Sequence, residues 1–108
     1  MSDPAPTAGR RRPPPTEDEL RLIRLGVAPF IAPGDQLTQL PAKHSKRMRV
    51  LEHIVSSAFA RDTDYDEATV NDQLARWCDG VRTDHVTLRR YLVDYGFMTR
   101  NAGAYRLT

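Results

Sequence analysis

The chain has 108 residues, a formal net charge of +2 and a hydrophobic content of 40%, values that fit one folded domain with a modest core. Its single cysteine, Cys78, excludes an internal disulfide and favours a reducing, cytoplasmic setting. No apolar run approaches the roughly 20 residues of a membrane-spanning helix, and the N-terminus lacks a signal-peptide pattern, so we expect no membrane association.

Charge is distributed in bands. Residues 43–49, "KHSKRMR", carry four cationic side chains and no acid. Residues 61–80 carry six acids and two arginines, and residues 82–108 carry five arginines and two acids. Two basic segments around an acidic one predict a protein with separate positive and negative surfaces, and so a directed electrostatic field, rather than a uniformly basic protein.

Residues 1–15 contain five prolines and almost no large apolar side chain. We expect a disordered tail, because such a segment buries too little surface to offset its ordering entropy. Its arginines, Arg10, Arg11 and Arg12, either solvate the tail or touch a polyanion. Residues 16–108 are then one domain.

Thr16 and Glu19 have the spacing of a capping box and predict that a short helix begins there. Gly26 is a plausible end for it. The apolar side of this helix is predicted to consist of Leu20, Ile23 and Val27.

The segment 27–43 is predicted to be irregular, since Pro29 and Pro33 forbid a continuing helix and "PGD" is typical of a turn. Four apolar residues are expected to attach it to the core: Phe30, Ile31, Leu37 and Leu40.

The strongest helix pattern lies at 43–60, where apolar residues recur at spacings of three, four and seven. These are Met48, Leu51, Ile54, Val55, Ala58 and Phe59.

The remaining elements follow in close order. A short extended piece is predicted around Asp64 and Tyr65, then a helix capped by Asp66, ending near residues 79–80 and carrying an apolar side. That side consists of Val70, Leu74 and Trp77. A helix over 84–95 follows, capped by Thr83 or Asp84, and then a hairpin over 97–107 that turns at 101–103.

Helix, short strand, helix, turn, helix, strand, turn and strand is the order of a winged helix-turn-helix. The sequence therefore predicts a mainly α domain with a small β-hairpin, a winged helix-turn-helix with an extra N-terminal helix.

The predicted third helix of this motif has two unlike sides. Its leucines, Leu88 and Leu92, fall with Tyr95 on one side, and Arg89 lies on the flank. The opposite side carries Thr83, Thr87, Arg90 and Asp94. Arginine can bond two acceptors on guanine, and threonine can meet phosphate or a thymine methyl, so this side suits the major groove.

Other cations are candidates for the flanks of such an interface. Arg100 and Arg106 lie on the predicted hairpin with Asn101 at its tip, and Lys43, Lys46 and Arg49 begin the long helix. About five phosphate contacts predict a log–log salt slope on the order of −4 to −5.

Alternatives stay open for these residues. Arg90 and Asp94 are four residues apart and form, in the alternative, only a surface ion pair worth about 0.3 kcal/mol. Arg89 alternatively braces an acid of the middle helix. Asp94 and the acidic middle segment repel phosphate, which favours a winged helix that binds protein, for example transcription machinery, instead of DNA.

No catalytic, metal or cofactor pattern stands out. His44, His53, His85 and Cys78 are scattered and lack the short paired spacing of metal ligands. We therefore expect no enzyme, no metal and no cofactor. Cys78 is expected to be a half-buried apolar side chain, with redox sensing as the alternative.

Three stretches, "LPAKHSKRMRVLEHI", "YDEATVNDQL" and "DHVTLRRYLVDYGFMTRNAGAYRL", resemble the bacterial domain-of-unknown-function family numbered 2087. The resemblance covers about residues 30–107 and implies a role in transcriptional control, because such domains accompany DNA-binding or regulatory modules. The matching positions are Leu40, Pro41, Lys43, Arg47, Tyr65, Val70, Asn71, Asp84, His85, Leu88, Arg89, Arg90, Leu92, Val93 and Asp94.

Together these observations lead us to expect a small cytoplasmic transcriptional regulator that binds double-stranded DNA through the helix at 84–95 and the hairpin at 97–107. We expect a homodimer, since paired half-sites raise the affinity of a module this small.

Overall fold

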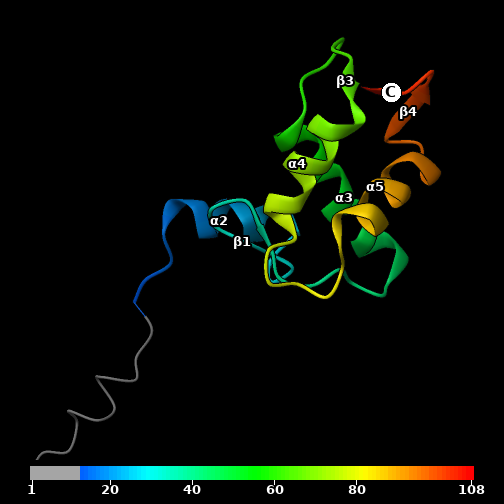
Figure 1. The fold of residues 1–108 in the computed structure, drawn as a ribbon. Coiled ribbons are helices and arrows are strands. Elements are labelled where there is room, and N and C mark those ends of the chain that lie inside the picture. Colours follow the sequence, from blue (N-terminus) through cyan, green and yellow to red (C-terminus); the bar gives the residue numbers. More distant parts are fainter. Residues whose placement is uncertain (1–12) are drawn as a thin grey trace, which may run out of the picture.

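The computed structural model describes residues 13–108 and places four helices and five short strands there (Figure 1). The prediction for the tail, including its three arginines, lies largely outside the described residues. The elements are α2 (Glu17–Arg24), β1 (Ile31–Ala32), β2 (Gln36–Leu37), α3 (His44–Ala58), β3 (Tyr65–Asp66), α4 (Glu67–Trp77), α5 (His85–Asp94), β4 (Met98–Asn101) and β5 (Ala104–Leu107).

The strands form two antiparallel sheets. β1 pairs with β2, while β3, β5 and β4 form a three-stranded sheet with β5 in the middle. Tyr65 of β3 lies opposite Tyr105, and Asn101 lies opposite Ala104 at the end of the C-terminal hairpin. The two turn residues of that hairpin both have positive φ, 51° at Ala102 and 82° at Gly103, as tight hairpin turns that match the strand twist require.

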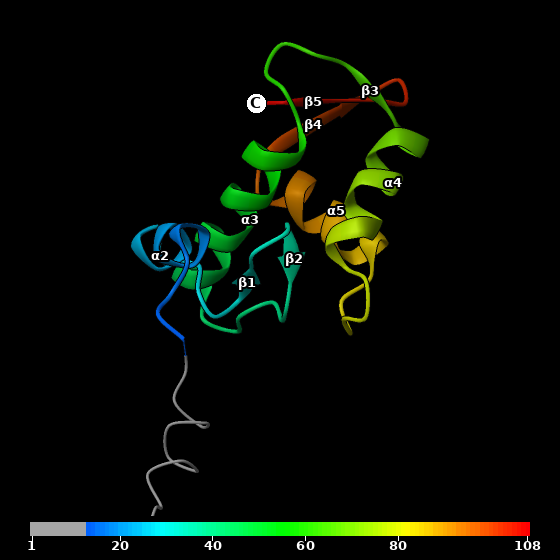
Figure 2. The ribbon, with the colours of Figure 1, turned by 90° about the vertical axis from the view of Figure 1, so that its left-hand side faces the viewer.

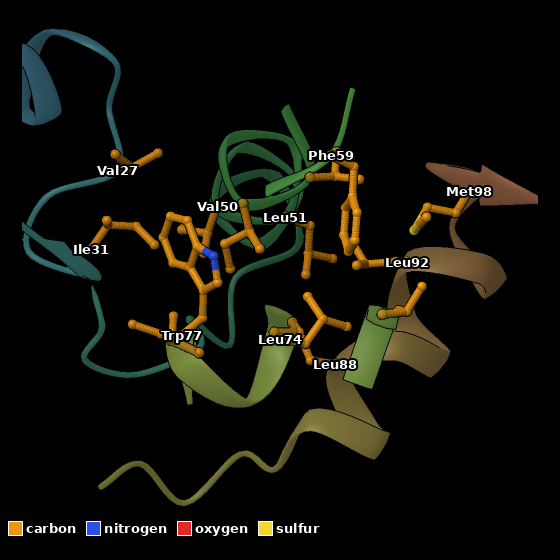
Figure 3. Packing of buried hydrophobic residues seen from close by; sticks show 14 of the residues in the cluster. Val27, Ile31, Val50, Leu51, Phe59, Leu74, Trp77, Leu88, Leu92 and Met98 are labelled. Carbon is orange, nitrogen blue, oxygen red and sulfur yellow. The ribbon is translucent and has the colours of Figure 1, made fainter. Parts of the chain in front are cut away.

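The core lies between α3, α4 and α5, with the three-stranded sheet at one end of the molecule (Figure 2). Figure 3 shows the Trp77 ring beside Ile31 and Val50, while Leu92 lies toward Met98 of β4. The buried apolar set is Leu22, Val27, Ile31, Leu37, Val50, Leu51, Ile54, Val55, Phe59, Val70, Leu74, Trp77, Leu88, Leu92, Met98 and Tyr105.

The predicted helices and the hairpin are confirmed, and the extended piece near Tyr65 is β3. The capping box is also confirmed: the Glu19 N–H donates to the Thr16 hydroxyl at 3.2 Å, and the Thr16 N–H donates to the Glu19 carboxylate at 3.1 Å.

The predicted apolar side of α2 is wrong. Leu22 faces the core, whereas Leu20 and Ile23 are exposed. Val27 is buried as predicted, but it lies beyond Gly26, whose φ of +76° turns the chain out of the helical path. A helix of two turns offers too few apolar residues to define one face by spacing alone.

The segment predicted to be irregular contains the β1–β2 hairpin, with its turn at the expected "PGD". Ile31 and Leu37 lie opposite each other and are buried. The side-chain amide of Gln36 donates to the carbonyls of Trp77 at 3.1 Å and Asp79 at 2.8 Å. These bonds satisfy acceptors at the end of α4 that lack partners within the helix.

Candidate nucleic-acid interface

α5 is held from both its start and its inner side. The Thr87 N–H donates to the Asp84 carboxylate at 2.8 Å, and this bond lowers the pKa of Asp84 below its ordinary value. Leu88 and Leu92 are fully buried against the other helices. The side that faces solvent therefore carries Thr87, Arg90 and Asp94, with Thr83 half-buried beside it.

Arg90 is exposed, and among residues 13–108 no carboxylate lies within 4.0 Å of its guanidinium. The alternative ion pair with Asp94 is thus not formed. Tyr95, predicted to face inward with the leucines, is 38% exposed, because it is the C-cap residue, where α5 ends at the surface.

Arg89 points inward, although it is adjacent to Arg90. Its guanidinium donates to the side-chain oxygen of Asn71 and lies 4.0 Å from Glu67, and its side chain is only 18% exposed. The alternative that Arg89 braces an acid of the middle helix is confirmed. A residue held in this way is not free to meet a ligand.

The carboxylate of Glu67 also joins the hairpin to the helices. It accepts a hydrogen bond from the Tyr105 hydroxyl at 2.9 Å, and Arg100 of β4 lies 3.7 Å from it. Two guanidinium groups, those of Arg89 and Arg100, therefore share one carboxylate and leave a net positive charge where α5 meets the hairpin. Sequence reasoning missed Glu67, although Glu67 and Asn71 are four residues apart and so lie on one face of α4.

Arg106 lies on the other face of the sheet. Neighbouring strand residues point to opposite faces, and the buried Tyr105 points toward the helices. Arg106 accordingly pairs with Asp64 at 2.8 Å. The structure does not bring Arg106 together with Arg90.

The cations at the start of α3 are also divided. Lys43 is the exposed N-cap residue of α3. Lys46 lies 5.9 Å from the centre of the Phe30 ring, and Arg49 lies against Gly26, so both face the N-terminal segment. Only Lys43 remains a candidate for a surface shared with α5.

The end of α5 and the start of α3 meet in an aromatic and cationic cluster that the sequence did not reveal. Tyr91 and Tyr95 stack at 5.6 Å, and His44 meets the Tyr95 ring edge-on at 5.8 Å. The Arg47 guanidinium lies 5.3 Å from the Tyr91 ring and donates to the Pro41 carbonyl at 3.0 Å. Arg47 therefore fixes the approach of the chain into α3.

The described residues contain no group of three or more His, Cys, Asp or Glu side chains that could hold a metal ion.

Burial raises the pKa of Cys78 to about 11, with the nearby Asp84 adding to the effect, so the thiol is protonated at neutral pH and its reactivity is low. Within residues 13–108, no helix is long and apolar enough to cross a membrane.

A family model matches residues 36–107, two thirds of the chain. The family is domain of unknown function 2087, described as an uncharacterized protein conserved in bacteria. The chain belongs to this family. No curated protein and no solved structure matches the chain.

Several polar residues in the family stretches have partners inside the domain. Asn71 binds Arg89, Asp84 caps α5, and the Tyr65 hydroxyl accepts from the Ala60 N–H at 2.8 Å. Arg90, from the same stretch as Arg89, has no such partner among the described residues.

Proposed function

We propose that this protein is a small transcriptional regulator that binds double-stranded DNA through α5 and the β4–β5 hairpin, as a winged helix-turn-helix. The order α3, β3, α4, α5, β4, β5 and the sheet order β3-β5-β4 support this arrangement. In such a domain α5 enters the major groove and the hairpin is the wing.

The observation that carries the proposal is the environment of Arg90. It projects from the exposed side of α5 with no carboxylate partner within the described residues, and Thr87 lies on the same side. A fork of guanidinium donors can bond both acceptors on a guanine edge, and each such contact contributes about 1–3 kcal/mol of discrimination. Asp94 lies one turn farther along, where its charge disfavours phosphate and restricts contact to the first two turns of α5.

The net positive charge around Glu67 extends the proposed DNA-binding surface from α5 to the wing. Arg100 is 58% exposed and 3.7 Å from Glu67, so it can exchange this weak pairing for a DNA phosphate while Arg89 stays in place. Lys43 is the additional phosphate contact from α3. Lys46, Arg49, Arg89 and Arg106 are not part of the proposed interface, because they face or bind other parts of the domain.

The test is the fluorescence anisotropy of a random-sequence duplex titrated with the full chain at low salt. We expect Arg90→Ala to weaken binding about 10- to 100-fold, a loss of about 1.5–3 kcal/mol, because a hydrogen bond to a charged group such as a phosphate is lost. Arg76→Ala is the matched control, since Arg76 is an exposed arginine of α4 that bonds only Gln73 within residues 13–108. Equal binding by the two variants, with unchanged circular dichroism, would refute the role of Arg90.

A second candidate is a winged helix that docks on a protein of the transcription machinery. It is favoured by the pairing of Arg100 and Arg106 with Glu67 and Asp64, which reduces the positive charge of the wing. This candidate predicts negligible binding of duplex DNA even at low salt, so the same titration separates the two.

A further inference from the structure

The exposed apolar side chains of the domain gather on α2. Five large apolar residues are exposed in the described part of the chain, and three of them lie on α2 or at its C-cap: Leu20 at 38%, Ile23 at 57% and Leu25 at 48%. Leu20 and Ile23 are three residues apart and are neighbours on one face of the helix. Exposed apolar groups concentrated in this way mark an interaction surface more often than scattered ones do.

The position of α2 leaves this face open. α2 contributes a single buried residue, Leu22, to the core. It lies at the edge of the molecule, on the side away from α4 (Figure 2). α2 also precedes the residues that match the family, 36–107. The surface is therefore separate from the proposed DNA-binding face and lies outside the residues that the family model matches.

The charges of α2 are divided along its length. Its first turn carries Glu17, Asp18 and Glu19, and its last turn carries Arg21 and Arg24. Two copies in parallel would place like charges together. Two copies in antiparallel order would place the acidic turn of each helix against the basic turn of the other, on both sides of the apolar residues.

We propose that α2 is a self-association helix, and that two copies of this chain pair through antiparallel α2 helices. Such a contact is isologous, because each copy offers the same patch and the charge pairs occur twice about a two-fold axis. Leu20 and Ile23 form its apolar centre. Glu17 of one copy lies near Arg24 of the other, since both are exposed and share a face with Leu20.

The dimer is expected to be weak. A pair of two-turn helices buries less than the roughly 800 Å² per partner of a standard stable interface, which points to a dissociation constant in the micromolar range. The proposal does not depend on DNA binding. It stands or falls on the association state of the free protein.

Analytical ultracentrifugation of the full chain, from low to several hundred micromolar, tests the proposal. We expect a monomer–dimer equilibrium that Ile23→Asp weakens at least about tenfold, since an apolar side chain is lost from each half of the interface. Val86→Asp is the matched control, because Val86 is 42% exposed on α5. A monomer at every concentration, or equal loss in both variants, would overturn the proposal.

A charge exchange identifies the antiparallel arrangement itself. Glu17→Arg makes the outer face of α2 basic, and Arg24→Glu makes it acidic. Each variant alone is expected to dimerise less than the unaltered chain, whereas an equimolar mixture regains dimer, because every charge pair of the mixed dimer is opposite. A mixture that stays as monomeric as its components would exclude this pairing. Circular dichroism confirms that both variants fold.

Discussion

Two neighbouring surfaces of the domain use arginine differently. Where α4 meets the hairpin, Arg89 and Arg100 both lie near the carboxylate of Glu67. On the outer side of α5, Arg90 has no carboxylate partner among the described residues. Since Arg89 and Arg90 are adjacent in the chain, the difference comes from helix geometry alone. Successive residues of a helix point in different directions, so Arg89 faces α4 while Arg90 faces solvent.

The buried leucines of α5, Leu88 and Leu92, are expected to hold the helix in place. Leu92→Ala is expected to lower the free energy of unfolding by about 2–5 kcal/mol, through lost burial and the cavity left behind. Val86→Ala, at an exposed position of the same helix, should change it by less than about 0.5 kcal/mol. Urea denaturation measures both. Similar small losses would mean that Leu92 does not hold α5 in place.

Substitution of Arg89 is expected to lower stability, whereas substitution of Arg90 is expected to weaken DNA binding. Arg89→Ala leaves the Asn71 side chain without its partner and should cost about 1–3 kcal/mol of stability. Arg90→Ala should leave stability within about 0.5 kcal/mol of the unaltered protein, while weakening DNA binding. Thermal denaturation and fluorescence anisotropy on the same samples measure stability and DNA affinity. If Arg90→Ala lowered stability and Arg89→Ala weakened only DNA binding, the roles given to the two arginines would be wrong.

Glu67→Gln is expected to make Arg100 more available to DNA. The change removes the charge beside Arg100 and keeps an oxygen that can accept from the Tyr105 hydroxyl. Affinity for duplex DNA should rise about 1.4- to fivefold, the effect of freeing an exposed ion pair worth roughly 0.2–1 kcal/mol. Asp72→Asn removes the same charge from α4 and is the control. An equal gain in the control would mean that only net charge matters.

The smallest expected effect concerns pH. The pKa of Asp84 in the folded protein is lowered from 3.8 by the Thr87 N–H. Its stabilising contribution is therefore present above about pH 3.8 and is lost as the pH falls through the folded-state value. Asp84→Asn keeps a good cap that does not titrate. Between about pH 5 and about pH 2 the melting temperature should fall less in this variant than in the unaltered protein. If the melting temperatures of both proteins fell equally, the Asp84 carboxylate would not stabilise the start of α5.

Much of the fold was predictable because its signals are local. Thr16 with Glu19 predicts the start of α2, and the apolar spacing of Leu51, Ile54 and Val55 predicts α3. Which side of α2 faces the core was not predictable, because the helix has only two turns and packs on the core through the chain reversal at Gly26.

The candidate site was less predictable because its contacts join distant segments. Arg106 and Asp64 are 42 residues apart in the chain, and Arg89 and Asn71 are 18 apart. Charge banding predicted two basic regions converging on one face. The fold instead places the acidic segment against the basic hairpin, so that only Arg90 and the partly paired Arg100 remain near the outer side of α5, with Lys43 at the start of α3.

The proposed binding of DNA by Arg90 on the exposed side of α5 can be measured through its salt dependence. Affinity for a random-sequence duplex, measured from about 50 to 200 mM salt, should give a log–log slope of about −3 if Lys43, Arg90 and Arg100 each meet a phosphate, which is the contact expected of Arg90 where no guanine faces it. Arg90→Ala should reduce the magnitude of this slope by about 0.9. A slope that is the same in both proteins, or no binding at the lowest salt, would contradict the account.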